Sequence, residues 1–389
     1  MIGTAARSSD VVVIGGGVIG CAIAYEVARA GLDVTVLERA GRVAAAASGK
    51  NPGVISLATK TPGRTATLAR ASALLFPELL ERLGDTCDYR REGSLVVFED
   101  DQEAAYLRDR ADALASQGIP LTFVDAAEAR EIQPLVENGI QGALWCALDA
   151  ILDPTALTAA LARAAADLGV HIGLREEVLG ISRKAGRVSG VRTSTGEWPA
   201  KWVVNAAGPW SAQVGRCLDI THPVSPRKGQ LISTEPMRGV PCVRVTSARE
   251  LVMKHGGAVE DRPAVGVGIT PKPDGTVIIG GTNEDVGFDE RVHAATCATI
   301  ALAAARLFPR LAGVRIVGAW AGFRPGCAGG PLVEAATGVE GYVVATGHGG
   351  DGVALAPITA RYVADLIGGE DAELSFEGYA DRIFAGGAP

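Results

Sequence analysis

The sequence predicts an α/β fold: a Rossmann-like nucleotide-binding domain built from discontinuous segments, with an inserted α+β domain that contains a mostly antiparallel sheet. Two observations support this prediction. A strand, a glycine-rich turn and a helix follow one another at residues 10–38, and a second strand with a glycine-rich turn occurs at residues 341–353. Between them, residues 170–317 contain mainly short strand patterns joined by turns, with one helix expected after residue 223. We therefore expect the chain to leave the nucleotide-binding domain and return to it.

The first element is a short β-branched run, residues 10–14, as expected for a buried parallel strand. Glycines follow at the first, third and sixth positions of the turn. Gly15 permits the tight turn, Gly17 lets the backbone approach a pyrophosphate, and Gly20 allows the helix to pack closely on the strand. The start of the helix offers free N–H groups to the phosphates. This unit predicts a dinucleotide site.

The second strand of this unit, residues 34–38, ends in an acidic residue. Glu38 follows Gly20 at close to the usual separation for a carboxylate that binds a ribose 2′-hydroxyl. Because such a carboxylate repels a 2′-phosphate, FAD or NAD is favoured over NADP.

The remaining elements follow from periodicity and turn residues. A strand pattern at 202–205 ends in small residues, which suggests a second close approach to the nucleotide by Ala207, Gly208 and Trp210. The expected helices lie at 65–83, 102–117, 154–169, 294–307 and 357–367, and further strands at 93–98, 276–280 and 341–346.

Composition excludes several classes of protein. The 389 residues carry a net charge of −7, which argues against binding to a nucleic-acid backbone. We find no apolar run long enough to span a membrane and expect no signal peptide, so a cytoplasmic location is expected. The seven cysteines have neither the spacing of a disulfide framework nor that of a metal site.

Several motifs in order along the chain resemble the flavoprotein amine oxidases of the D-amino-acid oxidase superfamily. The most similar branch contains glycine oxidase and sarcosine oxidase, together with the flavin subunits of proline, hydroxyproline and opine dehydrogenases. The motifs are the opening unit with Glu38-Arg39, the loop 48–53, Asp153-Pro154 before a helix, and the segments 205–208, 280–289, 320–325 and 345–348. The resemblance covers nearly the whole chain.

The resemblance implies non-covalent FAD and assigns its contacts. Val18, Ile19, Glu38 and Arg39 lie at the adenosine end, and Val178 meets the adenine. Ser48, Gly49, Lys50, Asn51, Pro52, Gly53 and Val54 run past the pyrophosphate to the flavin ring. His348, Gly349, Gly350, Asp351, Gly352 and Val353 form a turn whose N–H groups face the ring's pyrimidine edge and stabilise negative charge there.

The resemblance also assigns the substrate site. Arg324 matches the arginine that holds the substrate carboxylate, although an ordinary ion pair at a domain boundary is the alternative. His348 is a candidate for proton transfer or a core histidine, and Lys50 is a fixed charge near the flavin or a solvated lysine. Gly268 stands where the family often has a substrate-contacting tyrosine, which predicts an enlarged pocket. Cys327 lies too far along its motif to attach the flavin covalently.

Together these features predict an FAD-dependent oxidation of an amino acid at its Cα–N bond. The substrate is expected to be a secondary amine, such as an N-substituted glycine or a cyclic amino acid. Either oxygen or a protein or quinone partner would accept the electrons, and the chain could form a homo-oligomer or a hetero-oligomer. A flavin subunit that works only with a partner, or a nicotinamide-dependent dehydrogenase, are the alternatives. We expect an FAD-binding domain at 10–90, 150–222 and 318–372, a substrate-binding domain at 91–149 and 223–317, and tails at 1–9 and 380–389.

Overall fold

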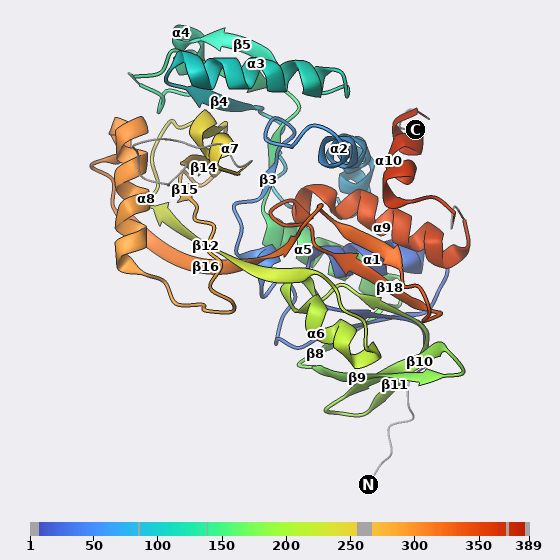
Figure 1. The fold of residues 1–389 in the computed structure, drawn as a ribbon. Helices are drawn as coiled ribbons and strands as arrows, with labels where there is room; N and C mark the ends of the chain where they lie inside the picture. The colour runs from blue at the N-terminus through green and yellow to red at the C-terminus, as the bar shows by residue number, and fades with distance from the viewer. Residues whose placement is uncertain (1–7, 85, 138, 255–266, 371–372, 386–389) are drawn as a thin grey trace.

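A computed structural model describes residues 8–84, 86–137, 139–254, 267–370 and 373–385, which form two eight-stranded sheets and one two-stranded sheet of β3 and β7 (Figure 1). The helices described are α1 (Val18–Arg29), α2 (Arg64–Leu83), α3 (Asp101–Ala115), α4 (Ala126–Ile132), α5 (Pro154–Asp167), α6 (Ser211–Gly215), α7 (Ala248–Lys254), α8 (Ala294–Leu307), α9 (Gly352–Gly368) and α10 (Phe376–Ala385). The strands are β1 (Ser9–Ile14), β2 (Val34–Glu38), β3 (Val54–Ile55), β4 (Ser94–Phe98), β5 (Thr122–Asp125), β6 (Gly142–Cys146), β7 (Ala150–Ile151), β8 (His171–Leu174), β9 (Val178–Lys184), β10 (Arg187–Thr193), β11 (Glu197–Asn205), β12 (Val224–Thr234), β13 (Arg244–Ser247), β14 (Gly268–Pro271), β15 (Val277–Gly280), β16 (Ile316–Cys327), β17 (Leu332–Ala335) and β18 (Tyr342–Thr346).

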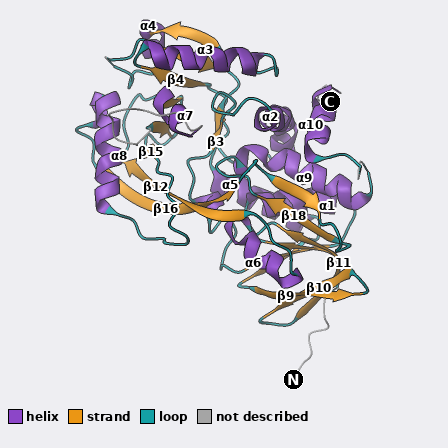
Figure 2. Ribbon diagram, in the orientation of Figure 1, coloured by secondary structure: helices purple, strands orange, loops and turns teal. Residues whose placement is uncertain are grey.

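The first sheet has the predicted Rossmann-like arrangement. Its strand order is β17-β18-β11-β1-β2-β8, and β1, β2, β8, β11 and β18 run parallel. Helices α1, α5 and α9 gather at this sheet, as Figure 2 shows in purple beside the orange strands. Because β11 and β18 pair beside β1, three distant parts of the sequence form one nucleotide-binding domain, which confirms the predicted fold class.

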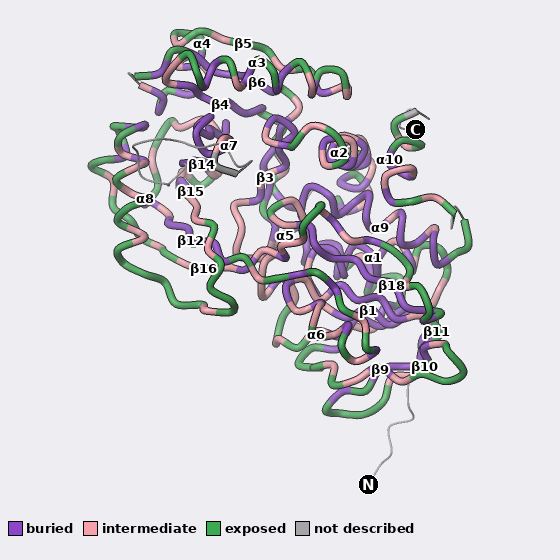
Figure 3. Tube along the Cα trace, in the orientation of Figure 1, coloured by how far each residue is buried: buried purple, intermediate pink, exposed green. Residues whose placement is uncertain are grey.

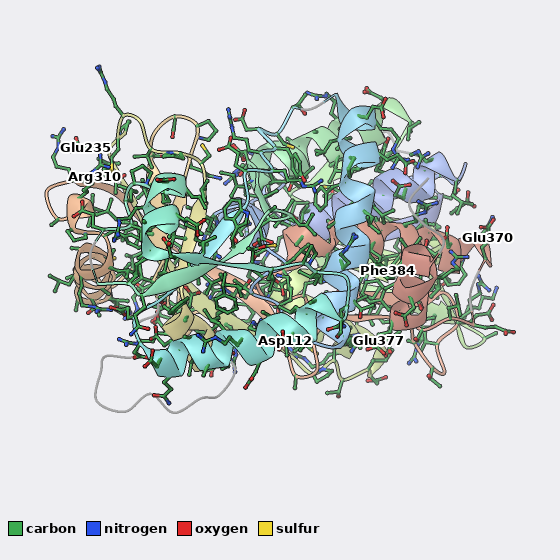
Figure 4. All side chains as sticks on the ribbon, turned by 90° about the horizontal axis from the view of Figure 1, so that it is seen from above. Asp112, Glu235, Arg310, Glu370, Glu377 and Phe384 are labelled. Carbon is green, nitrogen blue, oxygen red and sulfur yellow. The ribbon has the colours of Figure 1, made fainter. Side chains whose placement is uncertain are left out.

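The second sheet is mostly antiparallel, with the order β16-β12-β15-β14-β13-β4-β6-β5. Only the pair β4 and β13 is parallel among the described pairings of this sheet. Viewed from above, the two domains extend in opposite directions, with Glu235 and Arg310 at one end and Glu370 at the other (Figure 4).

Three details differ from the sequence-based expectation. The segment 223–317 contains a second helix, α7, in addition to the predicted one at 294–307. Helix α9 begins at Gly352 and not at Pro357, which brings its N-terminus to the glycine-rich turn. Residues 380–385, expected to be a tail, belong to α10, which packs beside α2. Residues 1–7 and 386–389 lie outside the described residues.

The predicted domain boundary at residue 318 falls inside β16. This strand pairs with β12 along most of its length, from Ile316 to Cys327, and so belongs to the second sheet. The pairing favours a boundary after Cys327, with Arg324 in the domain of the second sheet.

The buried core is continuous across the two domains. One cluster joins β1, β2, α1, α2, α5 and α9 to Leu107 and Leu114 of α3 and to Leu251 of α7. The tube in Figure 3 is purple along β1, α1 and α9, which marks this interior. A second cluster fills the space between the second sheet and α8. The shared cluster fixes the second sheet relative to the first.

No helix in the described part of the chain is long and apolar enough to cross a membrane.

Candidate active site

A cavity of about 370 Å³ extends from the carboxyl ends of the first sheet to the second sheet. Among the residues predicted to bind cofactor or substrate, those that line it are Gly15, Gly17, Val18, Ile19, Glu38, Arg39, Ser48, Lys50, Asn51, Pro52, Val54, Val178, Ala207, Gly208, Trp210, Arg324, His348, Gly349, Gly350, Asp351, Gly352 and Val353. Four others, Gly20, Gly49, Gly53 and Gly268, are not among the lining residues. A ligand at the carboxyl ends of parallel strands is the usual arrangement in an open α/β sheet.

The glycine-rich loop between β1 and α1 is closely packed. Gly15 has φ +111°, and a Cβ there would lie 2.6 Å from the Ala206 carbonyl oxygen. A Cβ at Gly20 would collide with the Gly15 carbonyl, so Gly20 supports the loop from outside the cavity. Gly17 is the N-cap residue of α1 and provides no side-chain cap. The first turn of α1 therefore opens into the cavity with the donors that a phosphate needs.

The loop after β2 is held by its own polar groups. The Val18 N–H donates to Ser48 Oγ at 2.9 Å. The Asn51 amide donates to the carbonyls of Ala47 and Ser48, and its oxygen accepts from the Gly53 N–H. Asn51 thus shapes the loop that lines the cavity.

Lys50 lies in the same loop beside the strand that carries Arg324. The Lys50 carbonyl accepts from the Trp320 indole N–H at 3.0 Å, and a Cβ at Gly322 would lie 2.9 Å from the Lys50 Cβ. Its Nζ is 3.9 Å from Glu290, a weak and exposed ion pair. A role for Lys50 as a fixed charge near the flavin stays a prediction.

Glu38 is held at one end of the cavity by two backbone N–H groups. Its Oε2 accepts from Gly16 and its Oε1 from Ala40, both at 2.7 Å. Next to it, the Arg39 guanidinium lies 3.8 Å from the centre of the Trp210 ring. A fixed carboxylate and an aromatic–cation stack suit the ribose and adenine of a dinucleotide.

Replacing Glu38 with arginine is expected to weaken FAD binding at least tenfold. The change removes the ribose acceptor and introduces a cation, and each charge-assisted hydrogen bond contributes about 1.5–3 kcal/mol. Fluorescence titration of apoprotein with FAD measures the affinity. Glu38→Gln, which keeps one acceptor oxygen, should lose less, and the exposed Glu197→Arg serves as the matched control. Unchanged affinity in Glu38→Arg would remove Glu38 from the site.

The glycine-rich turn before α9 is anchored to two other elements. Lys60, which is buried, forms an ion pair with Asp351, the N-cap residue of α9. The Gly349 N–H donates to the Pro325 carbonyl at 2.9 Å, which ties the turn to β16. These contacts fix the turn before any ligand binds.

His348 is a buried, neutral member of this turn. Its Nε2 lies 3.0 Å from Thr359 Oγ1 on α9, and burial lowers its pKa to about 4. The ring therefore connects the turn to α9, and a role in proton transfer stays a prediction.

This burial predicts a dependence of stability on pH. Unfolded His348 takes up a proton below its ordinary pKa of 6.5, whereas folded His348 stays neutral until about pH 4. The free energy of unfolding should therefore decrease by about 3 kcal/mol in total as the pH falls from 6.5 to 4, because the unfolded chain binds a proton that the folded chain does not. Denaturant unfolding across this pH range, compared with His348→Gln, should show a shallower pH dependence in the variant. Parallel pH profiles of stability in the unmodified protein and in His348→Gln would contradict this prediction.

Arg324 crosses the cavity from the second sheet. It projects from β16 over Gly229 of β12, where a Cβ would lie 2.7 Å from Arg324 Nη2. Its Nη1 donates to the Thr282 carbonyl at 3.0 Å, and its Cδ and Nε lie close to Gly350 in the glycine-rich turn. Burial lowers the pKa of Arg324, while the carboxylates of Glu250 and Asp351 raise it. Only the glycine at 229 leaves room for this path.

Five charged residues that line the cavity were not predicted from the sequence: Lys60, Glu176, Glu177, Arg244 and Glu250. Arg244 begins β13, and Glu250 lies in the first turn of α7; both are buried. No short motif marks Arg244 and Glu250, because their place depends on the pairing of β13 with β4 and β14.

Gly268 lies behind this part of the cavity. A Cβ at this position would be 3.3 Å from Glu250 Oε2, Thr246 Oγ1 and the Gly280 carbonyl. A larger side chain at residue 268 would have to displace Glu250 before it could line the cavity. That glycine at this position enlarges the pocket therefore stays a prediction.

Cys327 is the last residue of β16 and does not line the cavity, and burial raises its thiol pKa. A raised pKa disfavours the thiolate that a covalent flavin link would need.

The comparisons with known proteins define the class of this chain. A family model described as FAD-dependent oxidoreductase matches residues 10–366, and the chain belongs to that family. The expected family is thereby confirmed, and FAD rather than NAD is the cofactor that the site fits. The glycine-rich loop, the uncapped α1 and the fixed Glu38 are the features that would hold it.

Within the family, the chain is similar to glycine oxidase of Pseudomonas aeruginosa, with 34% identity over 94% of this chain and 96% of that protein. The bifunctional protein ThiO/ThiG of Trichormus variabilis is 33% identical over 92% of this chain, and the chain spans 52% of that longer relative. The structure of L-proline dehydrogenase from P. horikoshii superimposes with a TM-score of 0.85 at 25% identity, covering 99% of this chain and 100% of that one.

Proposed function

We propose that this chain oxidises an amino acid at its Cα–N bond, with a secondary amine such as an N-substituted glycine or a cyclic amino acid as substrate. Bound FAD supplies the hydride acceptor, flavin N5. The α-carbon loses a hydride, the nitrogen loses a proton, and the imine product is hydrolysed in water. The similarity to glycine oxidase and to L-proline dehydrogenase supports this reaction class.

The observation that supports this proposal most directly is the position of Arg324. It lies beside Gly350, and the following residue, Pro325, accepts the N–H of Gly349. This hydrogen bond joins the strand that carries Arg324 to the turn proposed to face the flavin. A substrate held by its carboxylate would have its α-carbon placed over the ring, and such positioning supplies much of the rate enhancement.

The residues of the chain mainly position the substrate and stabilise the reduced flavin. Arg324 binds the carboxylate in a two-point geometry, and the N–H groups of residues 349–353 favour negative charge on the reduced ring. The pKa of His348 is about 4, so the imidazole is neutral near pH 7 and is not an acid there. A substrate that arrives as the free amine needs no strong base in the protein.

Anaerobic stopped-flow reduction of the purified protein tests the proposal. The flavin absorbance should bleach with N-methylglycine or proline and only slowly with dimethylamine or pyrrolidine, which lack the carboxylate. Re-admission of air then identifies the acceptor: hydrogen peroxide marks an oxidase, and slow reoxidation marks a dehydrogenase that needs a partner. A flavin that no amino acid reduces would overturn the proposed function.

A further inference from the structure

The substrate end of the cavity contains a second buried arginine whose charge the proposed reaction does not use. Arg244 is 9% exposed and lines the cavity together with Arg324. Its Nη1 is shielded from solvent and has no hydrogen-bond partner among the described residues. A buried guanidinium N–H without an acceptor is costly, so its persistence points to a ligand acceptor.

The position of Arg244 is set by strand pairing and not by a mobile loop. It opens β13, which is paired with β4 on one side, where Arg244 stands opposite Ser94, and with β14 on the other. Arg324 enters the same cavity from β16. In the sheet, the strands β12, β15 and β14 lie between β16 and β13. The two guanidinium groups therefore approach the cavity from different strands of one sheet.

The charged groups at this end of the cavity favour a ligand with two carboxylates. Lys60 and Asp351 form an ion pair and neutralise each other. Arg244 and Arg324 are the two buried arginines that line the cavity, and the Glu250 carboxylate acts on Arg324. A ligand with one carboxylate would pair with Arg324 and leave Arg244 Nη1 without an acceptor, whereas a secondary amine with two carboxylates supplies an acceptor to each guanidinium group.

Resting on the proposed function, we propose that the substrate is a secondary amine bearing two carboxylates, one on the oxidised carbon and one on the nitrogen substituent. Arg324 holds the first carboxylate beside the glycine-rich turn, and Arg244 holds the second. Two planar guanidinium groups match two planar carboxylates, each by paired N–H donors.

A binding experiment tests this subsite without requiring turnover. Diglycolate has the shape of N-(carboxymethyl)glycine with an ether oxygen in place of the amine, and methoxyacetate lacks its second carboxylate. Titration of the holoprotein, followed by the flavin absorbance, should give a Kd for diglycolate 10- to 100-fold below that for methoxyacetate. Equal Kd values in the unmodified protein would overturn the proposal.

Variants at Arg244 separate the subsite from general damage. Arg244→Gln should weaken diglycolate at least tenfold and methoxyacetate by less than threefold, and Arg244→Lys should recover part of the difference. Arg315→Gln, at an exposed arginine paired with Glu235, is the matched control and should change neither value. Equal weakening of both ligands in Arg244→Gln and Arg244→Lys would make Arg244 a structural residue and overturn the proposal.

Turnover gives a readout that distinguishes the two proposals. In flavin reduction, kcat/KM for N-(carboxymethyl)glycine should exceed that for N-methylglycine at least tenfold, and Arg244→Gln should remove this preference mainly through KM. If neither amine reduces the flavin while diglycolate still binds through Arg244, the proposed reaction fails and the dicarboxylate subsite stands. If both amines react equally, the reaction stands and the subsite fails.

Discussion

Arg324→Lys should lower kcat/KM for amino acids by a factor that corresponds to about 2–4 kcal/mol of transition-state stabilisation. Lysine keeps the charge but not the planar pair of donors, so the carboxylate loses its fixed orientation beside the glycine-rich turn. The α-carbon is then misaligned, and hydride transfer tolerates little misplacement. The flavin spectrum should remain, because Arg324 meets the turn through Gly350 and not through a hydrogen bond that shapes it.

The deciding comparison is the rate of anaerobic flavin reduction by an amino acid and by its decarboxylated amine. Arg324→Lys should slow the amino acid strongly and the amine little, because the amine has no carboxylate to hold. Arg315→Lys provides the control for an arginine of the same domain that is exposed at the surface. An equal effect on both substrates would place the carboxylate site elsewhere and remove the main support for the proposed reaction.

Asp149→Ala should lower the free energy of unfolding by about 3–5 kcal/mol. This carboxylate is 1% exposed and accepts from the Ser56 hydroxyl, the Ser94 hydroxyl and the Leu57 N–H, each at 2.6 Å. Ser56 follows β3, whereas Ser94 begins β4 in the second sheet. Removing the carboxylate leaves three buried donors without an acceptor and loosens the contact between the domains.

Denaturant unfolding monitored by fluorescence measures this loss. Asp149→Asn, which keeps an oxygen acceptor, should lose about half as much. Asp153→Ala removes only the N-cap of α5, which accepts from Thr155 and Ala156, and should cost about 1 kcal/mol. If Asp149→Ala costs no more than Asp153→Ala, the three short hydrogen bonds do not contribute as their geometry implies.

The parts of the molecule that could be predicted from the sequence are those encoded in contiguous residues. The turn from Gly15 to Gly20 and the end of β2 at Glu38 lie within one unit, so spacing alone located them. Helix 294–307 was predicted with the bounds that the structure gives. Arg324 lies in a motif that is similar across its family, and it does reach the cavity.

The parts that could not be predicted depend on pairing between distant segments. Arg244 reaches the cavity only because β13 runs parallel to β4, a pairing that no local pattern in either strand specifies. In the sequence, Asp149 looks like an ordinary loop aspartate. Its hydrogen bonds come from Ser56 and Ser94, which are distant in the chain. Helix α7 is seven residues long, too short for a periodic signal, and so Glu250 was also missed. The charges of Arg244 and Glu250 were therefore not predicted from the sequence, although that of Arg324 was.

The strand order of the first sheet has a consequence for biosynthesis. β1 ends at Ile14 and pairs with β11, which pairs in turn with β18, beginning at Tyr342. While the ribosome is still making the second domain, the N-terminal unit lacks β18 and α9, and with them the turn that closes the cavity. Such distant pairing slows folding and leaves apolar strands temporarily uncovered. We therefore expect flavin binding to follow translation of residue 368, and a nascent chain arrested in α8 should retain no flavin.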